Sequence, residues 1–291
     1  MAEYSKQIQW FPGHMKKALV EMQNSIKLVD IVIEIVDARA PYSSSNPELK
    51  KIINNKPHLI MLNKADLADE IKTKQFIESY NKQGIFALSC SVMNLDFKKL
   101  KDKCQDILKE KFLKERSKGL KPRPIRAMIV GIPNVGKSSF INKIAKRKAA
   151  NVGNKPGVTK SQQMIKIDKD FELLDTPGVL WPKFEDLNVA TNLALLNSIK
   201  MDILPKDKLI ISLITKLVND YPNTLNKRYG DVEIIINDEN DIYQIIENIA
   251  KRRGLIISGN NLDIDRAIDL ILKEFADGLL GRFTLEDMSN G

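Results

Sequence analysis

The order of five short motifs constrains the fold of this chain more than any other feature. In sequence order they are Asn63-Lys64-Ala65-Asp66, Ser89-Cys90-Ser91, Gly131–Ser138, Thr159 and Asp175-Thr176-Pro177-Gly178. Most of them follow a short apolar, β-branched run, the pattern of a buried strand. We predict strands over residues 28–36, 58–62, 85–88, 125–130, 164–167 and 171–174, and helices over 16–27, 48–54, 71–80, 95–116 and 137–145. This alternation predicts an α/β fold with a doubly wound, mostly parallel sheet that binds ligands at the carboxyl ends of its strands.

The third motif, GIPNVGKS at residues 131–138, matches the phosphate-binding pattern GxxxxGK[ST]. Backbone N–H groups of such a P-loop surround the phosphates, and its glycines let the chain approach closely. We expect Lys137 to neutralise the β- and γ-phosphate oxygens and the Ser138 hydroxyl to bind Mg²⁺. The expected phosphate-binding residues are Asn134, Val135, Gly136, Lys137, Ser138 and Ser139.

The first two motifs have the form of the guanine-binding segments of Ras-like GTPases. The Asp66 carboxylate would accept hydrogen bonds from guanine N1–H and the 2-amino group, which adenine does not offer. Polar sites of this kind discriminate by roughly 10⁴-fold. Asn63 would support the loop, Lys64 would lie along the base, and a backbone N–H of Ser89-Cys90-Ser91 would meet guanine O6. We interpret Cys90 as a small packing residue and not as a nucleophile.

The last motif follows a predicted strand. In this position we expect Asp175 to orient Mg²⁺ and Gly178 to sense the γ-phosphate. Thr159 lies between the P-loop and this motif, so its hydroxyl could complete the Mg²⁺ shell when a γ-phosphate is present. The alternative for Thr159 is an ordinary surface threonine. The guanine-binding segments precede the phosphate-binding segments, so the set of motifs is complete but rotated. This order predicts a circularly permuted P-loop GTPase domain.

Val179 occupies the position at which Ras-like enzymes usually carry a water-orienting glutamine. Since valine has no polar side-chain atom, either hydrolysis is slow until a partner acts or another group orients the water. His14 could orient water or accept a proton. The residues alone favour a simpler role for His14 at the start of a helix.

Much of the net charge of +9 lies in one segment, residues 98–126. It contains twelve Lys or Arg residues and four acids: Lys98, Lys99, Lys101, Lys103, Lys109, Lys111, Lys114, Arg116, Lys118, Lys121, Arg123 and Arg126, against Asp102, Asp106, Glu110 and Glu115. One interpretation is a solvated helix face. The other is a basic ridge that faces a polyanion, for which RNA is the natural candidate.

The length of 291 residues suggests two domains. We place a circularly permuted GTPase domain at 1–204 and a small, mainly helical domain at 205–291, with helices near 206–219, 242–253 and 261–277 and a short strand or buried turn at 231–236. The sequence shows no apolar run long enough for a membrane span and no secretory signal. Its two cysteines cannot form a disulfide framework or a zinc site, so we expect a cytoplasmic protein.

The rotated order, together with QWFPGHM at residues 9–15 and DTPGVLWP at 175–182, resembles the bacterial ribosome biogenesis GTPase A (YlqF) family of circularly permuted TRAFAC GTPases. The resemblance runs over nearly the whole chain. It implies a C-terminal RNA-binding domain, action late in assembly of the large ribosomal subunit, and GTPase activity stimulated by the pre-ribosomal particle. It also implies that His14 orients the attacking water, that Val179 is the hydrophobic replacement of the glutamine, and that Asn134 coordinates potassium.

Two functions of different class fit these residues. The first is a ribosome-stimulated GTPase with a low intrinsic rate that binds rRNA, Mg²⁺ and K⁺ and works as a monomer. The second is an RNA-binding assembly scaffold that uses GTP mainly as a conformational ligand. A membrane-surface role for residues 98–126 ranks well below both, because the segment mixes charges and lacks a clear amphipathic pattern.

Overall fold

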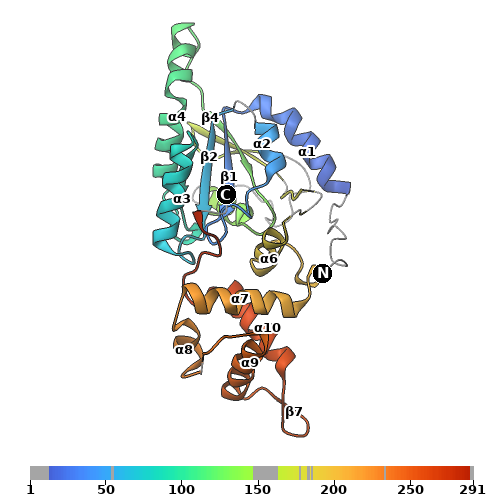
Figure 1. Ribbon diagram of the computed structural model, residues 1–291. Coiled ribbons are helices and arrows are strands. Elements are labelled where there is room, and N and C mark those ends of the chain that lie inside the picture. The colour runs from blue at the N-terminus through green and yellow to red at the C-terminus, as the bar shows by residue number, and fades with distance from the viewer. Residues whose placement is uncertain are drawn as a thin grey trace. The chain divides into compact units, whose positions relative to one another are not determined.

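A computed structural model of the chain (Figure 1) describes residues 13–53, 56–146, 163–176, 178–181, 184, 186–232 and 234–288. The chain divides into two compact units. The first comprises Met1–Glu185 together with Glu286–Gly291, and the second comprises Asp186–Leu285. Within the described parts of the chain, no helix combines the length and the apolar character needed to cross a membrane.

A single sheet forms the centre of the first unit. Its strands are β1 (Ile31–Asp37), β2 (His58–Asn63), β3 (Phe86–Ser89), β4 (Ile125–Val130), β5 (Gln163–Lys166) and β6 (Phe171–Asp175). They lie in the order β3-β2-β1-β4-β6-β5, and every pair is parallel except β5 with β6. All residues of β1 are buried, as expected for a central strand covered on both faces. The predicted α/β fold with a mostly parallel, doubly wound sheet is confirmed.

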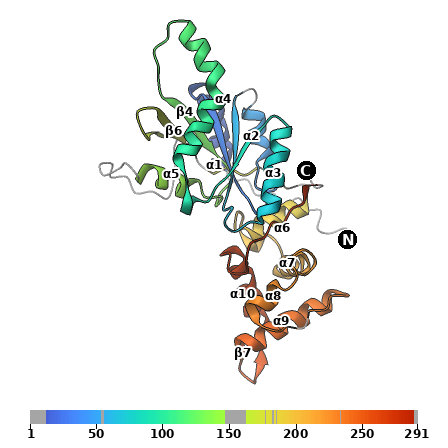
Figure 2. The same ribbon diagram turned by 90° about the vertical axis from the view of Figure 1, so that its left-hand side faces the viewer.

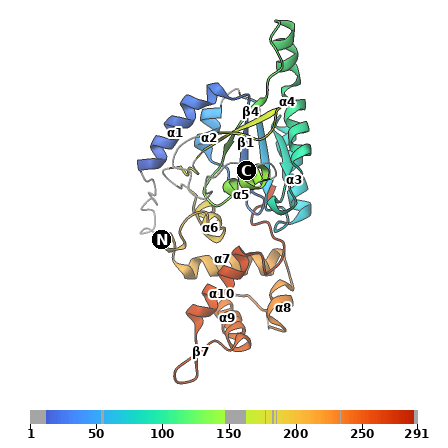
Figure 3. The same ribbon diagram turned by 180° about the vertical axis from the view of Figure 1, so that it is seen from behind.

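Helices cover both faces of this sheet. They are α1 (Gly13–Ser25), α2 (Pro47–Ile53), α3 (Glu70–Lys82), α4 (Phe97–Ser117) and α5 (Lys137–Lys146), with short 3₁₀ turns at Ile26–Leu28 and Val92–Asn94. Figure 2 shows α4 and α5 on one face of the sheet and α2 and α3 on the other, although α3 and α4 overlap in the view of Figure 1. The C-terminal end of α4 extends beyond the sheet, as Figure 3 also shows.

The sequence of α4 explains its start and its packing. The Asp96 side chain accepts a hydrogen bond from Lys99 N, which caps the first turn. Leu100, Cys104 and Leu108, spaced four residues apart, form its buried stripe. The remaining positions are largely charged, so the same helix that packs on the sheet also presents a basic outer face.

The second unit is mainly helical, as expected. Its helices are α6 (Leu187–Leu195), α7 (Lys206–Asp220), α8 (Thr224–Tyr229), α9 (Glu239–Arg253) and α10 (Ile264–Ala276), and a small hairpin pairs β7 (Ile256–Ile257) with β8 (Asn261–Leu262). Our sequence analysis missed α6, α8 and the hairpin, each of which is too short to show a clear period. Residues 231–236 contain no strand at their described positions, but Val232 is buried.

The limits of the two units differ from the predicted division at residue 204. Because α6 packs against α7 and α10, the second unit already begins at Asp186. The chain then leaves this unit after Leu285, and Glu286 and Asp287 form polar contacts within the first unit. Contacts between residues so far apart in sequence produce no local pattern that could have indicated this return.

Candidate nucleotide-binding site

The register of the sheet brings the motifs together at one edge. Asn63, at the end of β2, is paired with Asp37 at the end of β1, and Ser89 at the end of β3 is paired with Leu62. The P-loop follows β4, and Asp175 ends the neighbouring strand β6. The carboxyl edge of the sheet therefore carries both the guanine-type and the phosphate-type motifs, as predicted.

Two hydrogen bonds join the first motif directly to the P-loop. Asn63 Nδ2 donates to the carbonyl of Val135 at 2.7 Å, and Lys64 Nζ donates to the carbonyl of Asn134 at 2.9 Å. Lys64 and Asn134 both have a left-handed backbone, with φ of 58° and 61°. Left-handed backbone is uncommon outside glycine and is concentrated at functional sites. Segments far apart in sequence thus form one continuous surface.

Two P-loop glycines are required by close approach of neighbouring groups. At Gly136, with φ of 101°, an added Cβ would overlap Asn63 Nδ2. At Gly131, with φ of 150°, it would lie 2.5 Å from the carbonyl oxygen of Ile35 in β1. The loop can follow this path only because no side chain lies in the way.

A buried ion cluster supports Lys64 from below, and our sequence analysis did not predict it. Asp37 is fully buried and receives Arg39 Nη2 and Lys64 Nζ, each at 2.9 Å from Oδ2. Burial alone would raise the pKa of Asp37, but the two cations outweigh it and hold the pKa at about 2. Asp37 is the polar residue at the end of an apolar run, as Asn63 is at the end of the next strand. That position is the sequence signal that could have indicated a role for Asp37 in the site.

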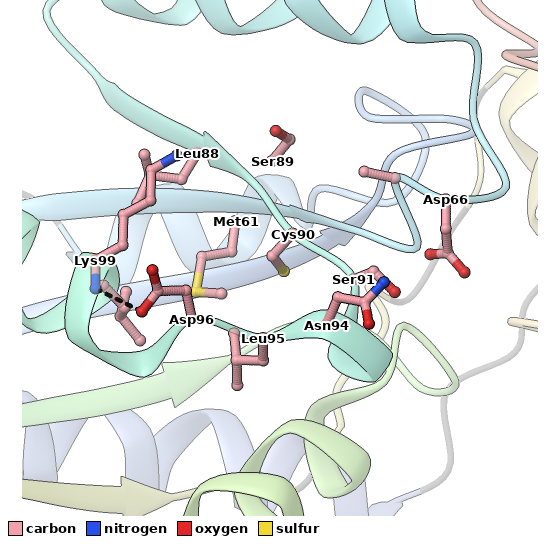
Figure 4. Close-up of a pocket in the computed structure, with 12 residues that line it drawn as sticks. Met61, Asp66, Leu88, Ser89, Cys90, Ser91, Asn94, Leu95, Asp96 and Lys99 are labelled. Carbon is pink, nitrogen blue, oxygen red and sulfur yellow. Dashed lines mark hydrogen bonds between the residues drawn. The ribbon is translucent and has the colours of Figure 1, made fainter.

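A pocket of about 330 Å³ lies where guanine is expected. Its lining comprises Met61, Ala65, Asp66, Leu88, Ser89, Cys90, Ser91, Asn94, Leu95, Asp96, Lys99 and Leu100. Figure 4 shows Asp66, Ser91 and Asn94 at one end and Leu88 and Lys99 at the other. The pocket therefore combines an acidic side chain with apolar walls, which suits a flat base with a polar edge.

Cys90 belongs to this pocket as a structural residue. Its backbone N–H donates to Leu62 O, its carbonyl accepts from Ala65 N, and its Sγ lies 3.5 Å from Asn63 Oδ1. Burial, and next the charge of Asp66, raise the pKa of the Cys90 thiol to about 12. A thiol with such a pKa is protonated at neutral pH, which supports a packing role and opposes a nucleophilic one.

The P-loop lysine is buried, with an exposed fraction of only 7%. Lys137 Nζ donates to the carbonyls of Gly131 and Ile132 at 2.9 and 2.8 Å. Burial lowers the pKa of Lys137 to about 8, although Asp175 acts in the opposite direction. A Cβ at Gly178 would lie 2.8 Å from this ammonium group, so the backbone of the last motif passes directly beside it.

The structure describes some of the residues predicted to bind Mg²⁺ and to act on water, but not all of them. Ser138 and Ser139 are exposed at the start of α5, and Asp175 is partly exposed at the end of β6. These oxygen donors fit Mg²⁺, which usually takes one or two carboxylate ligands and completes its shell with water and substrate phosphate. His14 lies in α1, but its side chain is outside the described part of the chain, as is Thr159 altogether.

Val179 is completely buried, and its backbone is held from two sides. Its N–H lies 3.4 Å from the carbonyl of Gly131, and its carbonyl accepts a 2.8 Å hydrogen bond from Asn46 Nδ2. The sequence analysis gave Asn46 no role, because nothing near it in the sequence resembles a nucleotide-binding motif.

Four members of the basic segment form ion pairs within the first unit. Lys101 pairs with Asp168 and Asp170, and Lys111 and Arg123 pair with Asp30. Arg126 pairs with Glu172. Much of the remaining basic charge is exposed along the outer part of α4 and after it: Lys98, Lys99, Lys109, Lys114, Arg116, Lys118 and Lys121. The paired residues thus have structural partners within the unit, and contact of the exposed ones with a polyanion stays a prediction.

Comparison with known proteins shows the family of the chain. A family model described as 50S ribosome-binding GTPase matches residues 126–255. A ribosome biogenesis GTPase A from Bacillus cereus is 46% identical over 280 residues, covering 96% of this chain and 93% of that protein. The chain belongs to the ribosome biogenesis GTPase A family. This assignment confirms the family resemblance and the predicted class of enzyme, a GTPase.

Solved structures of the family have the same fold. GDP-bound TM YlqF matches with a TM-score of 0.65 and 26% identity, covering 92% of this chain and 99% of that one. GNP-bound YlqF from T. maritima matches with a TM-score of 0.62 and 27% identity, covering 93% and 97%. Members of the ribosome biogenesis GTPase A family have thus been observed with guanine nucleotides.

Proposed function

We propose that this chain is a ribosome-stimulated GTPase that binds rRNA and acts in late assembly of the large ribosomal subunit. It hydrolyses GTP to GDP and phosphate, with a low intrinsic rate. The observation that carries this proposal is the pair of hydrogen bonds from Asn63 and Lys64 to carbonyls of the P-loop. They join the segment that we assign to the base to the loop that we assign to the phosphates, which supports binding of a nucleoside triphosphate.

The base is selected at the pocket beside Asp66. The Asp66 carboxylate accepts hydrogen bonds from the guanine edge, and Lys64, fixed by Asp37, lies along the base. A backbone N–H of the Ser89-Cys90-Ser91 segment would meet O6, and it is not that of Cys90, which already donates to Leu62 O. Adenine would leave the carboxylate without donors, and a polar group left unsatisfied against a bound base is costly.

The phosphates lie along the P-loop. Backbone N–H groups of Val135, Gly136 and Ser139 surround them, and Lys137 neutralises the β- and γ-oxygens. Ser138, Asp175 and Thr159 would hold Mg²⁺, and Asn134 would hold K⁺. These cations supply positive charge that stabilises the transition state when they are bound.

Hydrolysis requires a group that orients water, since Val179 is buried and aliphatic. We assign this role to His14, and the sensing of the γ-phosphate to the backbone N–H of Gly178. The Gly178 backbone passes beside Lys137 Nζ, as this role demands. A site without a polar side chain at position 179 is consistent with a low intrinsic rate.

RNA binding is supported by exposed basic residues in both units. The first unit presents Lys109, Arg116 and Lys121 on the outer part of α4 and after it. The second presents an exposed group formed by Lys227, Lys251, Arg252 and Arg253. Together with the 50S ribosome-binding description of the matching family, these surfaces favour the large subunit and its rRNA as partners of a cytoplasmic, monomeric protein.

The test is GTP turnover in potassium buffer, with and without purified large ribosomal subunits. We expect the subunits to raise kcat strongly, and His14→Ala to abolish that rise without weakening GTP binding. If subunits bind in a GTP-dependent way but leave kcat unchanged, the chain is instead an assembly scaffold that uses GTP as a conformational ligand. If subunits neither bind nor stimulate, immature particles become the partner to test.

A further inference from the structure

The loop between β1 and α2, residues 38–46, is unusually polar for a segment this deeply buried. Arg39, Ser43, Ser44, Ser45 and Asn46 are all no more than 7% exposed. Buried polar groups are stable only when they are hydrogen-bonded, so their partners indicate what the loop holds in place. We refer to residues 38–46 as the β1–α2 loop.

One end of the loop is fixed by Glu34, a buried carboxylate in the central strand β1. Glu34 Oε1 accepts hydrogen bonds from Ser45 Oγ at 2.9 Å and from the backbone N–H of Asn46 at 3.2 Å. The backbone of Asn46 is therefore anchored to the most rigid part of the sheet.

The other part of the loop is fixed by Glu286, which follows directly after the second unit. Glu286 Oε2 accepts from Tyr42 N and Oε1 from Ser43 N, both at 2.8 Å, and Oε1 also accepts from the Ser43 hydroxyl. Ser44 Oγ in turn accepts from the backbone N–H of Asp37 at 2.9 Å. The loop is thus held along most of its length by contacts that do not involve the side chain of Asn46.

The contacts of Asn46 determine the orientation of its amide group. Asn46 Oδ1 accepts a 2.9 Å hydrogen bond from Glu48 N, as the residue that caps the start of α2 would. Since the oxygen is used by the helix, the NH₂ group points to the carbonyl of Val179, at 2.8 Å. The donor is fixed by its surroundings and needs no rearrangement to hold Val179.

The Val179 backbone is consequently held between Asn46 and the P-loop. Its carbonyl is bound by Asn46, and its N–H lies 3.4 Å from Gly131 O. The preceding residue, Gly178, passes beside Lys137 Nζ, so a small displacement of Val179 would move Gly178 relative to that group. A hydrogen bond from the Gly178 N–H to a γ-phosphate would depend on how this backbone is positioned.

We propose that Asn46 is a positioning residue of the GTPase reaction, which holds the Val179 carbonyl so that the Gly178 N–H meets the γ-phosphate. This inference rests on the proposed role of Gly178. GDP has no γ-phosphate, so loss of the Asn46 donor should weaken binding of GTP analogues and spare binding of GDP. A residue that served only the stability of the loop would affect both nucleotides alike.

The test compares two substitutions of Asn46 in the full-length chain. Asn46→Ser keeps a side-chain oxygen that can cap α2 but removes the amide donor, whereas Asn46→Ala removes both functions. Affinities for a non-hydrolysable GTP analogue and for GDP are measured by fluorescent-nucleotide competition with Mg²⁺. Asp263→Ala is the matched control, because Asp263 caps α10 in the second unit by accepting from Arg266 N and its loss reports on removal of a helix cap alone.

We expect both Asn46 variants to lose about 3- to 10-fold in affinity for the GTP analogue, the value of one hydrogen bond, with GDP affinity within about 2-fold of wild type. Asp263→Ala should leave the ratio of the two affinities unchanged. Equal losses for both nucleotides, or no loss for either, would overturn the inference. If the wild-type chain itself failed to bind guanine nucleotides, the proposed function would fail instead, so the two failures are distinguishable.

Discussion

The side-chain amide of Asn63 donates a 2.7 Å hydrogen bond to the backbone carbonyl of Val135, across 72 residues of sequence. This bond joins the first motif of the chain to the third, in a buried position. The neighbouring glycine, Gly136, leaves space for the Asn63 amide that a side chain would fill. The rotated order of motifs therefore has a direct structural counterpart, in which the guanine-type loop supports the phosphate-type loop.

The Asn63–Val135 bond can be tested by Asn63→Ala, which leaves a buried carbonyl without its donor. The expected cost is about 1–3 kcal/mol in the free energy of unfolding, with weaker binding of GTP and GDP alike. Chemical denaturation and nucleotide titration measure the two effects. Asn81→Ala, at an exposed position of α3, is the control and should change neither. Unchanged nucleotide affinity in Asn63→Ala would show that the bond does not support the site.

Lys137 should couple nucleotide binding to proton uptake. Burial lowers its pKa from 10.5 to about 8. Anionic phosphates beside Nζ favour the charged form and raise that pKa, so binding at pH 9 should take up close to one proton and binding at pH 7.5 far less. Calorimetry in buffers with different ionisation enthalpies measures the uptake. The absence of uptake at both pH values would contradict the assignment of Lys137 to the phosphates.

The same lowered pKa affects folding stability with a defined sign. Between pH 8 and pH 10.5 the unfolded chain holds more protons at Lys137 than the folded protein. Its contribution to the free energy of unfolding therefore rises with pH across that range. Lys137→Met should remove this rise. In denaturation curves at pH 8 and pH 10, the change in the free energy of unfolding from pH 8 to pH 10 should therefore be less positive in the variant than in the wild type.

Asp37 should contribute stability that acid removes. Its pKa is lowered from 3.8 to about 2, so its contribution is fully present above pH 4 and is lost as the pH falls from 4 to 2. At neutral pH, Asp37→Asn should cost about 3–5 kcal/mol, because it leaves Arg39 buried without its counter-ion. Denaturation at pH 6 and pH 2.5 should show a smaller loss on acidification in the variant. An equal loss in both proteins would refute this role of Asp37.

The exposed basic residues near the end of α4 should bind RNA through its phosphates. Combined replacement of Lys114, Lys118 and Lys121 by alanine should weaken rRNA binding and reduce the salt dependence of the affinity by about one unit of slope for each phosphate that is no longer neutralised. Replacement of Lys51, Lys74 and Lys82 on α2 and α3 removes the same charge elsewhere and is the control. Equal effects of the two triple variants would show that RNA is attracted by the overall positive charge of the protein and not by the basic segment in particular.

The sequence was sufficient to predict the sheet and the placement of the motifs along it. Strand β4 begins and ends at the predicted residues, and β5 and β6 overlap the predicted strands at 164–167 and 171–174. These elements are encoded locally, by apolar runs that end at turn residues or at polar motifs. The predicted site residues that the structure describes in full also lie along the same edge of the sheet, because that edge follows from parallel topology.

The contacts that fix the site could not be predicted in the same way. Glu286 reaches Tyr42 across 244 residues, and Asn46 reaches Val179 across 133. Neither contact is preceded by a periodic pattern or a motif, because a single buried hydrogen bond needs only one suitable residue at each end. The sequence did not indicate a role for Arg39 either, because Arg39 is needed as a counter-ion only when Asp37 is buried in the folded protein.

The most direct measurement is competition between guanosine and xanthosine triphosphates for the wild-type chain and for Asp66→Asn. The Asp66 carboxylate lies in the pocket that the guanine-type motifs form, and that pocket belongs to the same surface as the P-loop. Xanthine carries a carbonyl where guanine carries its 2-amino group, so an asparagine donor suits it better than a carboxylate. We predict that the wild type prefers GTP and that Asp66→Asn shifts the preference towards xanthosine triphosphate by at least about 10²-fold. An unchanged preference for GTP in Asp66→Asn would contradict the single nucleotide site built from both groups of motifs.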